Sequence, residues 1–402
     1  MPEGQGAAPA RFGQMLLALI VGQIGLHATM AGVRMAAPLQ SLREGHSAWS
    51  VGVLMALYAA APVLLSMHAG RMADRMGYHR PVHIAIGLSL FGALLAVGST
   101  FVGPAARFPL LCASAVFVGS GANMGLIVIQ RRAGQAVSTP TERMRMFSWL
   151  GIAPSLSNVV GPVLAGFMID AGGFRAAYAL MLALPLLTWG CTRFIPREPR
   201  DAAPANASEA PSTWSLLAAP GLKRLLIVNW VLSACWDVHM FAVPILGFER
   251  GFSATTIGLI VGTFTLAVSG VRLLIPLWAH RISEIALLRA AMVGTAIVFG
   301  LYPLAHSPWL MGGCAVLLGL TLGSVQPMIM TTLHLLTPAG RYGEAIAMRS
   351  TVMNASSTAM PLLFGAAGTA LGAPALFWLV GGAVASGSWV ARRLPGGAPA
   401  SP

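Results

Sequence analysis

About twelve stretches of roughly 20 apolar residues decide what this chain can fold into. A helix needs about 20 such residues to cross the hydrocarbon layer of a bilayer, and short polar or Pro/Gly-rich breaks separate the stretches. Only 9% of the 402 residues are charged, against roughly 25% in soluble domains. We therefore predict an all-α polytopic membrane protein. Its expected spans are 14–38, 50–70, 82–102, 108–130, 146–169, 174–195, 222–247, 255–278, 287–304, 309–334, 345–370 and 374–391.

The net charge of +13 follows membrane topology. If the N-terminus is cytoplasmic, 19 of the 25 Lys and Arg residues fall on the cytoplasmic side, as the positive-inside rule requires. Four fall on the other side: Arg43, Arg107, Arg175 and Arg250. We expect both termini in the cytoplasm, no nucleic-acid partner and, from the use of 24 Arg against one Lys, a bacterial inner membrane.

The one long hydrophilic stretch, 196–220, is rich in Pro and Ala and is predicted to be a flexible cytoplasmic linker. It divides the chain into an N-terminal six-helix half, 1–195, and a C-terminal six-helix half, 221–402. The four cysteines lie inside apolar stretches without CxxC spacing, so neither a disulfide framework nor a zinc site is indicated. We expect no metal and no other cofactor.

The two halves repeat one another. At an offset of 206 residues identical positions include Pro38/Pro244, Gly45/Gly251, Ser47/Ser253, Ala48/Ala254, Gly52/Gly258, Ala61/Ala267, Ala73/Ala279 and Arg75/Arg281. At offsets of 198 and 199, Thr139-Pro140-x-x-Arg143 and Pro162-x-x-x-Gly166 match Thr337-Pro338-x-x-Arg341 and Pro361-x-x-x-Gly365. Parallel six-helix repeats are a known plan of transporters, with the substrate path between the halves.

The predicted loop between helices 2 and 3 carries a recognisable motif, Gly70-Arg71-Met72-Ala73-Asp74-Arg75-Met76-Gly77-Tyr78-His79-Arg80. It resembles the G-x-x-x-D-R-x-G-[R/K]-[R/K] signature of the major facilitator superfamily, with Tyr78 and His79 in place of the basic pair and Arg80 directly after. The resemblance implies a twelve-helix transporter fold. It also implies that Asp74 contacts the start of helix 11 near Glu344 and holds the outward-open state. A plain turn without a gating role is the alternative.

Helix 5 carries Gly161-Pro162-Val163-Leu164-Ala165-Gly166. This resembles the G-P-x-x-G-G motif of drug:proton antiporters, with Ala165 replacing one glycine. Small residues and Pro let helices approach closely and bend, although an ordinary kinked packing helix would look the same. Such exporters carry an arginine in helix 4, where this chain has Ala115, so the proton-coupling group must lie elsewhere.

Asp237 is the only acidic residue inside a predicted span. An ionisable group at the bilayer centre costs about 2.5–3.5 kcal/mol, so each one that is present needs a partner, a wet cavity or a function. The 206-residue offset superimposes Ala31 on Asp237, and His27 and Arg34 lie four residues before and three after Ala31 on one helical face. We expect this face to line the central cavity in both halves.

Our hypothesis is that Asp237 carries the transported proton and that Arg272 or Arg34 modulates its charge. A permanent ion pair that fixes helices 7 and 8 is the alternative, and either arginine could instead snorkel to the headgroups. His239, two residues after Asp237, is expected to pack against a neighbouring helix.

Other polar or amphipathic residues within the predicted spans are further candidates for lining the cavity. The alternative is that each forms an ordinary interhelical hydrogen bond, worth about 0.6 kcal/mol. They are Gln23, Tyr58, Asn123, Asn158, Asn229, Trp236, Gln326 and Asn354. Gln326 is followed by Pro327, which frees a backbone carbonyl of the preceding turn.

The function expected from these features is proton-coupled export of a small organic solute, such as a drug, siderophore or metabolite. The partners would be that solute, protons and the lipid bilayer, with the monomer as the working unit. An importer of an organic anion with the same fold is one alternative, since the cavity arginines favour anionic or chelating solutes. A lipid flippase or a membrane enzyme is another, but no HExxH, GxSxG or GxxxxGK[ST] motif supports catalysis or ATP-driven pumping.

Overall fold

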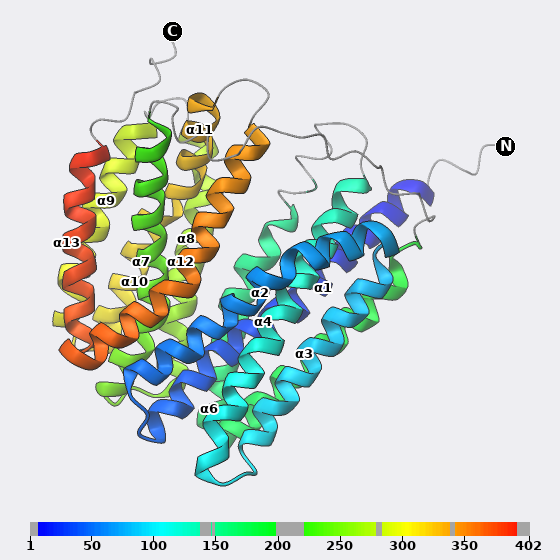
Figure 1. Cartoon of the computed structure of the whole chain (residues 1–402), viewed down its shortest axis with the longest axis horizontal. Helices are drawn as coiled ribbons and strands as arrows, with labels where there is room; N and C mark the ends of the chain where they lie inside the picture. Colours follow the sequence, from blue (N-terminus) through cyan, green and yellow to red (C-terminus); the bar gives the residue numbers. More distant parts are fainter. Residues whose placement is uncertain are drawn as a thin grey trace. The chain divides into compact units, whose positions relative to one another are not determined.

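A computed structural model describes residues 7–136, 146, 149–197, 221–278, 284–337 and 342–391, and within these ranges every regular element is a helix (Figure 1). The predicted all-α membrane fold is confirmed. The α-helices are α1 Ala7–Arg43, α2 Ala48–Met76, α3 His79–Ser99, α4 Pro104–Gln135, α6 Ile152–Cys191, α7 Leu222–Glu249, α8 Ala254–Trp278, α9 Glu284–Leu301, α10 Pro308–Gly323, α11 Val325–Leu336, α12 Tyr342–Leu371 and α13 Ala373–Ala391.

The helices follow the predicted spans with two differences. Helix α6 covers the fifth and sixth spans as one run of 40 residues, which would be about 60 Å long and twice the thickness of the hydrocarbon layer. Gly173, at φ 77° and ψ −178°, divides it into two crossings. The tenth span is divided into α10 and α11 at Ser324, because Pro327 cannot donate to the carbonyl of Gly323 four residues earlier.

Glycines with left-handed backbone show the duplication directly. Gly45 and Gly251, which are 206 residues apart, have φ values of 83° and 73° directly after α1 and α7. Gly173 and Gly372, which are 199 residues apart, have φ values of 77° and 84°. Only glycine adopts such angles without strain, so both halves turn at corresponding positions for the same reason.

The chain forms two compact units, which are described separately. The first consists of residues 1–45, 57–205 and 253–258, and the second of residues 46–56, 206–252 and 259–402. In the first unit α1 packs along α6, and α3 packs along α4 (Figure 1). A buried apolar cluster that includes Leu19, Leu26 and Ile129 fills the space between α1 and its neighbours. In the second unit α13 packs against α7 and α9, and α12 packs against α7.

The arginines predicted to lie opposite the cytoplasmic side have structural contacts at helix ends. Arg107 pairs with Glu44 at 3.4 Å, and Arg175 lies over the ring of Phe101 at 3.9 Å. Arg250 donates to the backbone carbonyls of Tyr302, Pro303 and Ala305. Burial lowers the pKa of the Arg250 guanidinium, and the Glu249 carboxylate opposes that shift. The three hydrogen bonds hold Arg250 against the turn that follows α9.

Gly173→Ala tests the division of α6. A side chain at this backbone conformation should cost about 1–3 kcal/mol and lower the thermal unfolding temperature of the detergent-solubilised protein. Gly190→Ala is the matched control, because Gly190 has no positive φ and no neighbour within 4 Å of an added Cβ. Equal unfolding temperatures for the two variants would contradict the role given to Gly173.

Candidate functional site

In the first unit, one face of α1 carries polar side chains at positions 23, 27 and 34. Gln23 is only 1% exposed, and among the described residues neither its amide nitrogen nor its amide oxygen has a hydrogen-bond partner. The Nδ1 atom of His27 and the Nε atom of Arg34 are likewise buried without a partner in the described part of the chain. The predicted polar face therefore exists, and its hydrogen-bonding groups are unused.

Tyr58 of α2 adds a fourth group to this face. Its side chain is 5% exposed, and its hydroxyl has no hydrogen-bond partner within the described ranges. The charge of Arg34 acts on both Tyr58 and His27, so Arg34 lies within electrostatic range of each of these two side chains. The structure thus brings together two predicted cavity residues of α1 and one of α2.

In the second unit, Asp237 is buried in α7 with 7% exposure. Arg272 of α8 is half-buried and donates to the amide oxygen of Gln326, on α11, at 3.1 Å. Within the part of the chain that the structure describes, Arg272 forms no ion pair with Asp237. Two predicted site residues, Arg272 and Gln326, therefore pair with each other, and a permanent Asp237–Arg272 bridge between helices 7 and 8 is not observed.

Arg349 is a further polar residue in this unit that is not among the predicted site residues. It is one of the 19 basic residues assigned to the cytoplasmic side. It lies about two turns inside α12 and donates to the amide oxygen of Asn229 at 3.5 Å. The amide nitrogen of Asn229 in turn contacts the sulfur of Met353 at 3.0 Å. The signal available in the sequence was the position of Arg349 four residues inside the predicted span 345–370.

The aromatic residues around Asp237 have packing roles. His239 is fully buried, its ring centroid lies 4.1 Å from that of Phe264, and its Nδ1 lies 3.2 Å from the hydroxyl of Tyr302. The prediction that His239 packs against a neighbouring helix is confirmed. Trp236, which precedes Asp237 in the sequence, packs its ring edge-to-face against Phe264, with ring centroids 4.7 Å apart.

Asn158 is occupied within its own helix. Its amide nitrogen donates to the carbonyl of Pro154 at 2.9 Å, which favours the structural alternative for this candidate. Asn354 lies in α12, but its side chain is outside the described residues, so its place in the cavity stays a prediction.

The loop 2–3 motif forms the expected turn. Gly77 has a φ of 69° between α2 and α3, Tyr78 is buried, and Arg75 and Arg80 are exposed. Gly70 lies within α2. The side chains of Asp74 and Glu344 lie outside the described residues, so the predicted contact of Asp74 with the start of helix 11 stays a prediction.

The helix 5 motif is a site of close backbone approach. A Cβ at Gly161 would lie 2.6 Å from the carbonyl oxygen of Ala28 on α1. A Cβ at Gly166 would overlap the carbonyl of Ala254 at the start of α8, and one at Gly258 would lie 2.5 Å from the carbonyl oxygen of Pro162. Gly161, Pro162 and Gly166 therefore pack α6 against two different helices.

The second unit repeats this contact. A Cβ at Gly365 on α12 would lie 2.9 Å from the carbonyl oxygen of Ala48 at the start of α2, and one at Gly52 would overlap the carbonyl of Pro361. These four positions correspond to Gly166, Ala254, Gly258 and Pro162 at the repeat offsets. Four of the identities that revealed the duplication in the sequence are thus at residues where helix backbones touch.

At each of these two helix contacts a side chain also accepts hydrogen bonds from backbone N–H groups of the neighbouring helix. The accepting side chain differs between the two units. The carboxylate of Asp170 accepts hydrogen bonds from the backbone N–H groups of Ala254 and Thr255, at 3.1 and 2.7 Å. At the corresponding position, the hydroxyl of Thr369 accepts one from the N–H of Trp49 at 2.9 Å. Both side chains satisfy donors in the first turn of a helix, but only Asp170 can be charged.

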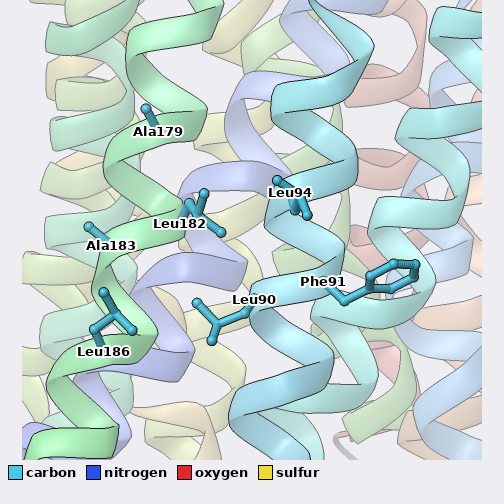
Figure 2. Close-up of a pocket in the computed structure, with 7 residues that line it drawn as sticks. All are labelled: Leu90, Phe91, Leu94, Ala179, Leu182, Ala183 and Leu186. Carbon is cyan, nitrogen blue, oxygen red and sulfur yellow. The ribbon is translucent and has the colours of Figure 1, made fainter.

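A groove of about 490 Å³ lies between α3 and α6, where Figure 2 shows seven lining residues: Leu90, Phe91, Leu94, Ala179, Leu182, Ala183 and Leu186. All seven side chains are apolar. The groove offers no group that would orient a polar solute, and in a bilayer a surface of this kind is covered by acyl chains.

Comparison with known proteins supports one family over the whole chain. The profile of the Major Facilitator Superfamily matches residues 19–226 and again residues 225–401. An efflux pump of Aspergillus niger, azaK, is 26% identical, with 90% of this chain and 83% of the relative aligned. The enterobactin exporter EntS of Salmonella choleraesuis is also 26% identical, with 77% and 75% aligned.

Solved structures share the fold at low identity. A bacterial homologue of the lysosomal transporter Spinster has a TM-score of 0.75 at 12% identity, covering 96% of this chain and 98% of that one. A bacterial homologue of the iron transporter ferroportin has a TM-score of 0.73 at 16% identity, covering 94% and 98%. The chain belongs to the Major Facilitator Superfamily. It is a multi-pass membrane protein and a secondary transporter.

Asp170→Ala tests the acceptor at the start of α8. Loss of both hydrogen bonds should cost about 0.5–2 kcal/mol, the usual range for removing a helix cap, and lower the thermal unfolding temperature. Asp170→Asn keeps an acceptor and should lie between the alanine variant and the parent protein. Thr369→Val removes a single bond in the second unit and should have the smallest effect. An unchanged unfolding temperature for Asp170→Ala would refute the capping role.

Proposed function

We propose that the protein is a proton-coupled exporter of a small organic solute. It would act as a monomer in the inner membrane of a bacterium, by alternating access and with both termini in the cytoplasm. The observation that carries this proposal is the burial of Asp237 inside α7 with only 7% exposure, as the one acidic residue in the interior of a predicted span.

A carboxyl group in this setting is suited to carry a proton. Desolvation disfavours its charged form, while a change in the surrounding charges favours it again. A conformational change that alters the surroundings of Asp237 would therefore bind and release one proton. Burial of a neutral Asn would satisfy packing equally well, so packing alone does not require an acid at this position.

The relatives support the direction and the kind of solute. The similar proteins include an efflux pump, an enterobactin exporter and, at 28% identity over 52% of this chain, the multidrug resistance protein MdtL of Escherichia coli. Two of these names describe export, and the third describes resistance to several drugs. The close packing at Gly161, Pro162 and Gly166 is consistent with the antiporter-like motif of helix 5.

Asp237→Asn tests proton coupling. Proteoliposomes with an entrapped pH-sensitive dye and an imposed pH gradient would be challenged with a panel of solutes, from benzoate to tetraphenylphosphonium. We expect at least one solute to move protons through the parent protein, and at least a tenfold loss of that signal in Asp237→Asn.

The matched control is Glu249→Gln, which neutralises the acid at the end of the same helix and should retain proton movement. Proton-driven flux with unaltered pH dependence in Asp237→Asn would rule out Asp237 as the coupling group. A parent protein that moves no protons with any solute would rule out the antiporter itself.

A further inference from the structure

We propose that His27 and Arg34 of α1, together with Tyr58 of α2, form a subsite that binds the carboxylate group of the transported solute. This inference rests on the proposed function in assuming that a solute enters the protein, and it goes further by assigning the chemical class of the solute. Four observations in the first unit lead to it.

The first observation concerns the charge of Arg34. Only two acidic side chains of the first unit are described, Glu44 and Asp170. Glu44 accepts from Arg107 at 3.4 Å and from Gln40 at 2.9 Å, and Asp170 accepts from the backbone at the start of α8. Within the described ranges, Arg34 therefore has no carboxylate partner. A guanidinium inside a membrane helix without a counter-charge is unfavourable unless an anion binds there.

The second observation concerns the depth of Arg34. Helix α1 continues for nine residues beyond it, to Arg43, which is about 13 Å at the rise of an α-helix. Arg34 therefore lies about two and a half turns from the C-terminal end of α1, and its Nε atom is buried.

The third observation concerns the hydrogen bonds that the other two side chains lack. The hydroxyl of Tyr58 and the Nδ1 of His27 are buried and have no partner in the described part of the chain. Each unsatisfied group costs about 1–3 kcal/mol, and proteins rarely bury several together without an occupant. A polar ligand that pairs with them would relieve this cost.

The fourth observation concerns their arrangement. Residues 27 and 34 are seven positions apart, so at 100° and 1.5 Å per residue they lie within about 20° of one another around α1 and about 10 Å apart along its axis. Tyr58 approaches from α2, and the charge of Arg34 acts on both Tyr58 and His27. The donors of these side chains can therefore be directed at a single bound group.

The chemistry of the donors selects the ligand. A guanidinium presents a planar fork of N–H groups that matches a carboxylate with two parallel hydrogen bonds. The Tyr58 hydroxyl can donate a further bond to the same two oxygens. A cation would be repelled by Arg34, and a neutral amide would leave its charge uncompensated. An organic carboxylate is thus the class of solute that satisfies these side chains.

Equilibrium binding tests the subsite without any proton gradient. The full-length protein in phosphatidylcholine nanodiscs, where no anionic lipid competes, would be titrated with hexanoate, benzoate and 2,3-dihydroxybenzoate, each against its own primary amide. We expect at least one carboxylate to bind more tightly than its amide, and inorganic phosphate to compete with it weakly. If no carboxylate binds more tightly than its amide, or if phosphate displaces it at equal concentration, the proposal is wrong.

Single substitutions test which residues are responsible for the tighter binding of carboxylates than of amides. Arg34→Gln should weaken carboxylate binding about ten- to hundredfold, as expected for loss of charge-assisted hydrogen bonds, and leave amide binding unchanged. Tyr58→Phe removes only a hydroxyl and should weaken carboxylate binding several-fold, which keeps the test decisive if Arg34→Gln does not fold. Arg107→Gln, a loss of charge at a helix end, is the matched control and should keep the full preference.

Two outcomes separate this proposal from the proposed function. A carboxylate preference that Arg34→Gln abolishes, in a protein that moves no protons, would uphold the subsite and reject the antiporter. Proton-coupled transport of solutes that carry no anionic group, with Arg34→Gln fully active, would uphold the antiporter and reject the subsite.

Discussion

Inside a bilayer no water is available to pair with a backbone amide, and the rest of this structure depends on that constraint. Each crossing must satisfy its own N–H and C=O groups, which only helices and closed barrels achieve. Within a helix these groups pair with each other, but at each helix end up to four backbone donors or acceptors lack a partner in the helix. Asp170 and Thr369 supply acceptors at the starts of α8 and α2, and Arg250 supplies donors at the end of α9.

The duplicated halves share their packing and differ in their chemistry. Corresponding glycines bring backbones together at Gly166 and Gly365, because two helices must approach closely in the same way in both halves. At positions proposed to bind a solute or a proton, the halves diverge: Arg34 corresponds to Met240, and Asp237 to Ala31. Symmetric positions thus hold the fold together, and asymmetric positions carry the groups proposed to bind a carboxylate and a proton.

The sequence predicted the helices well because the length and apolarity of a membrane span leave a strong one-dimensional signal. The turn at Gly77 and the packing of His239 were also predictable, since local motifs and helical periodicity determine them. The pairing of Arg272 with Gln326 and of Arg349 with Asn229 was not. Which polar side chains meet across helices depends on the rotation and depth of each helix, and apolar periodicity fixes neither to within one residue.

The break between α10 and α11 gives the second half of the duplication a mechanical property that the first lacks. In the first unit, α4 is one uninterrupted helix of 32 residues, whereas α10 stops at Gly323 and α11 starts at Val325. Because Pro327 has no N–H to donate to the carbonyl of Gly323, one backbone hydrogen bond is already missing at this point. The first half therefore has a continuous helix where the second half has an interrupted one that can bend. Gln326, the partner of Arg272, lies in the first turn after this interruption.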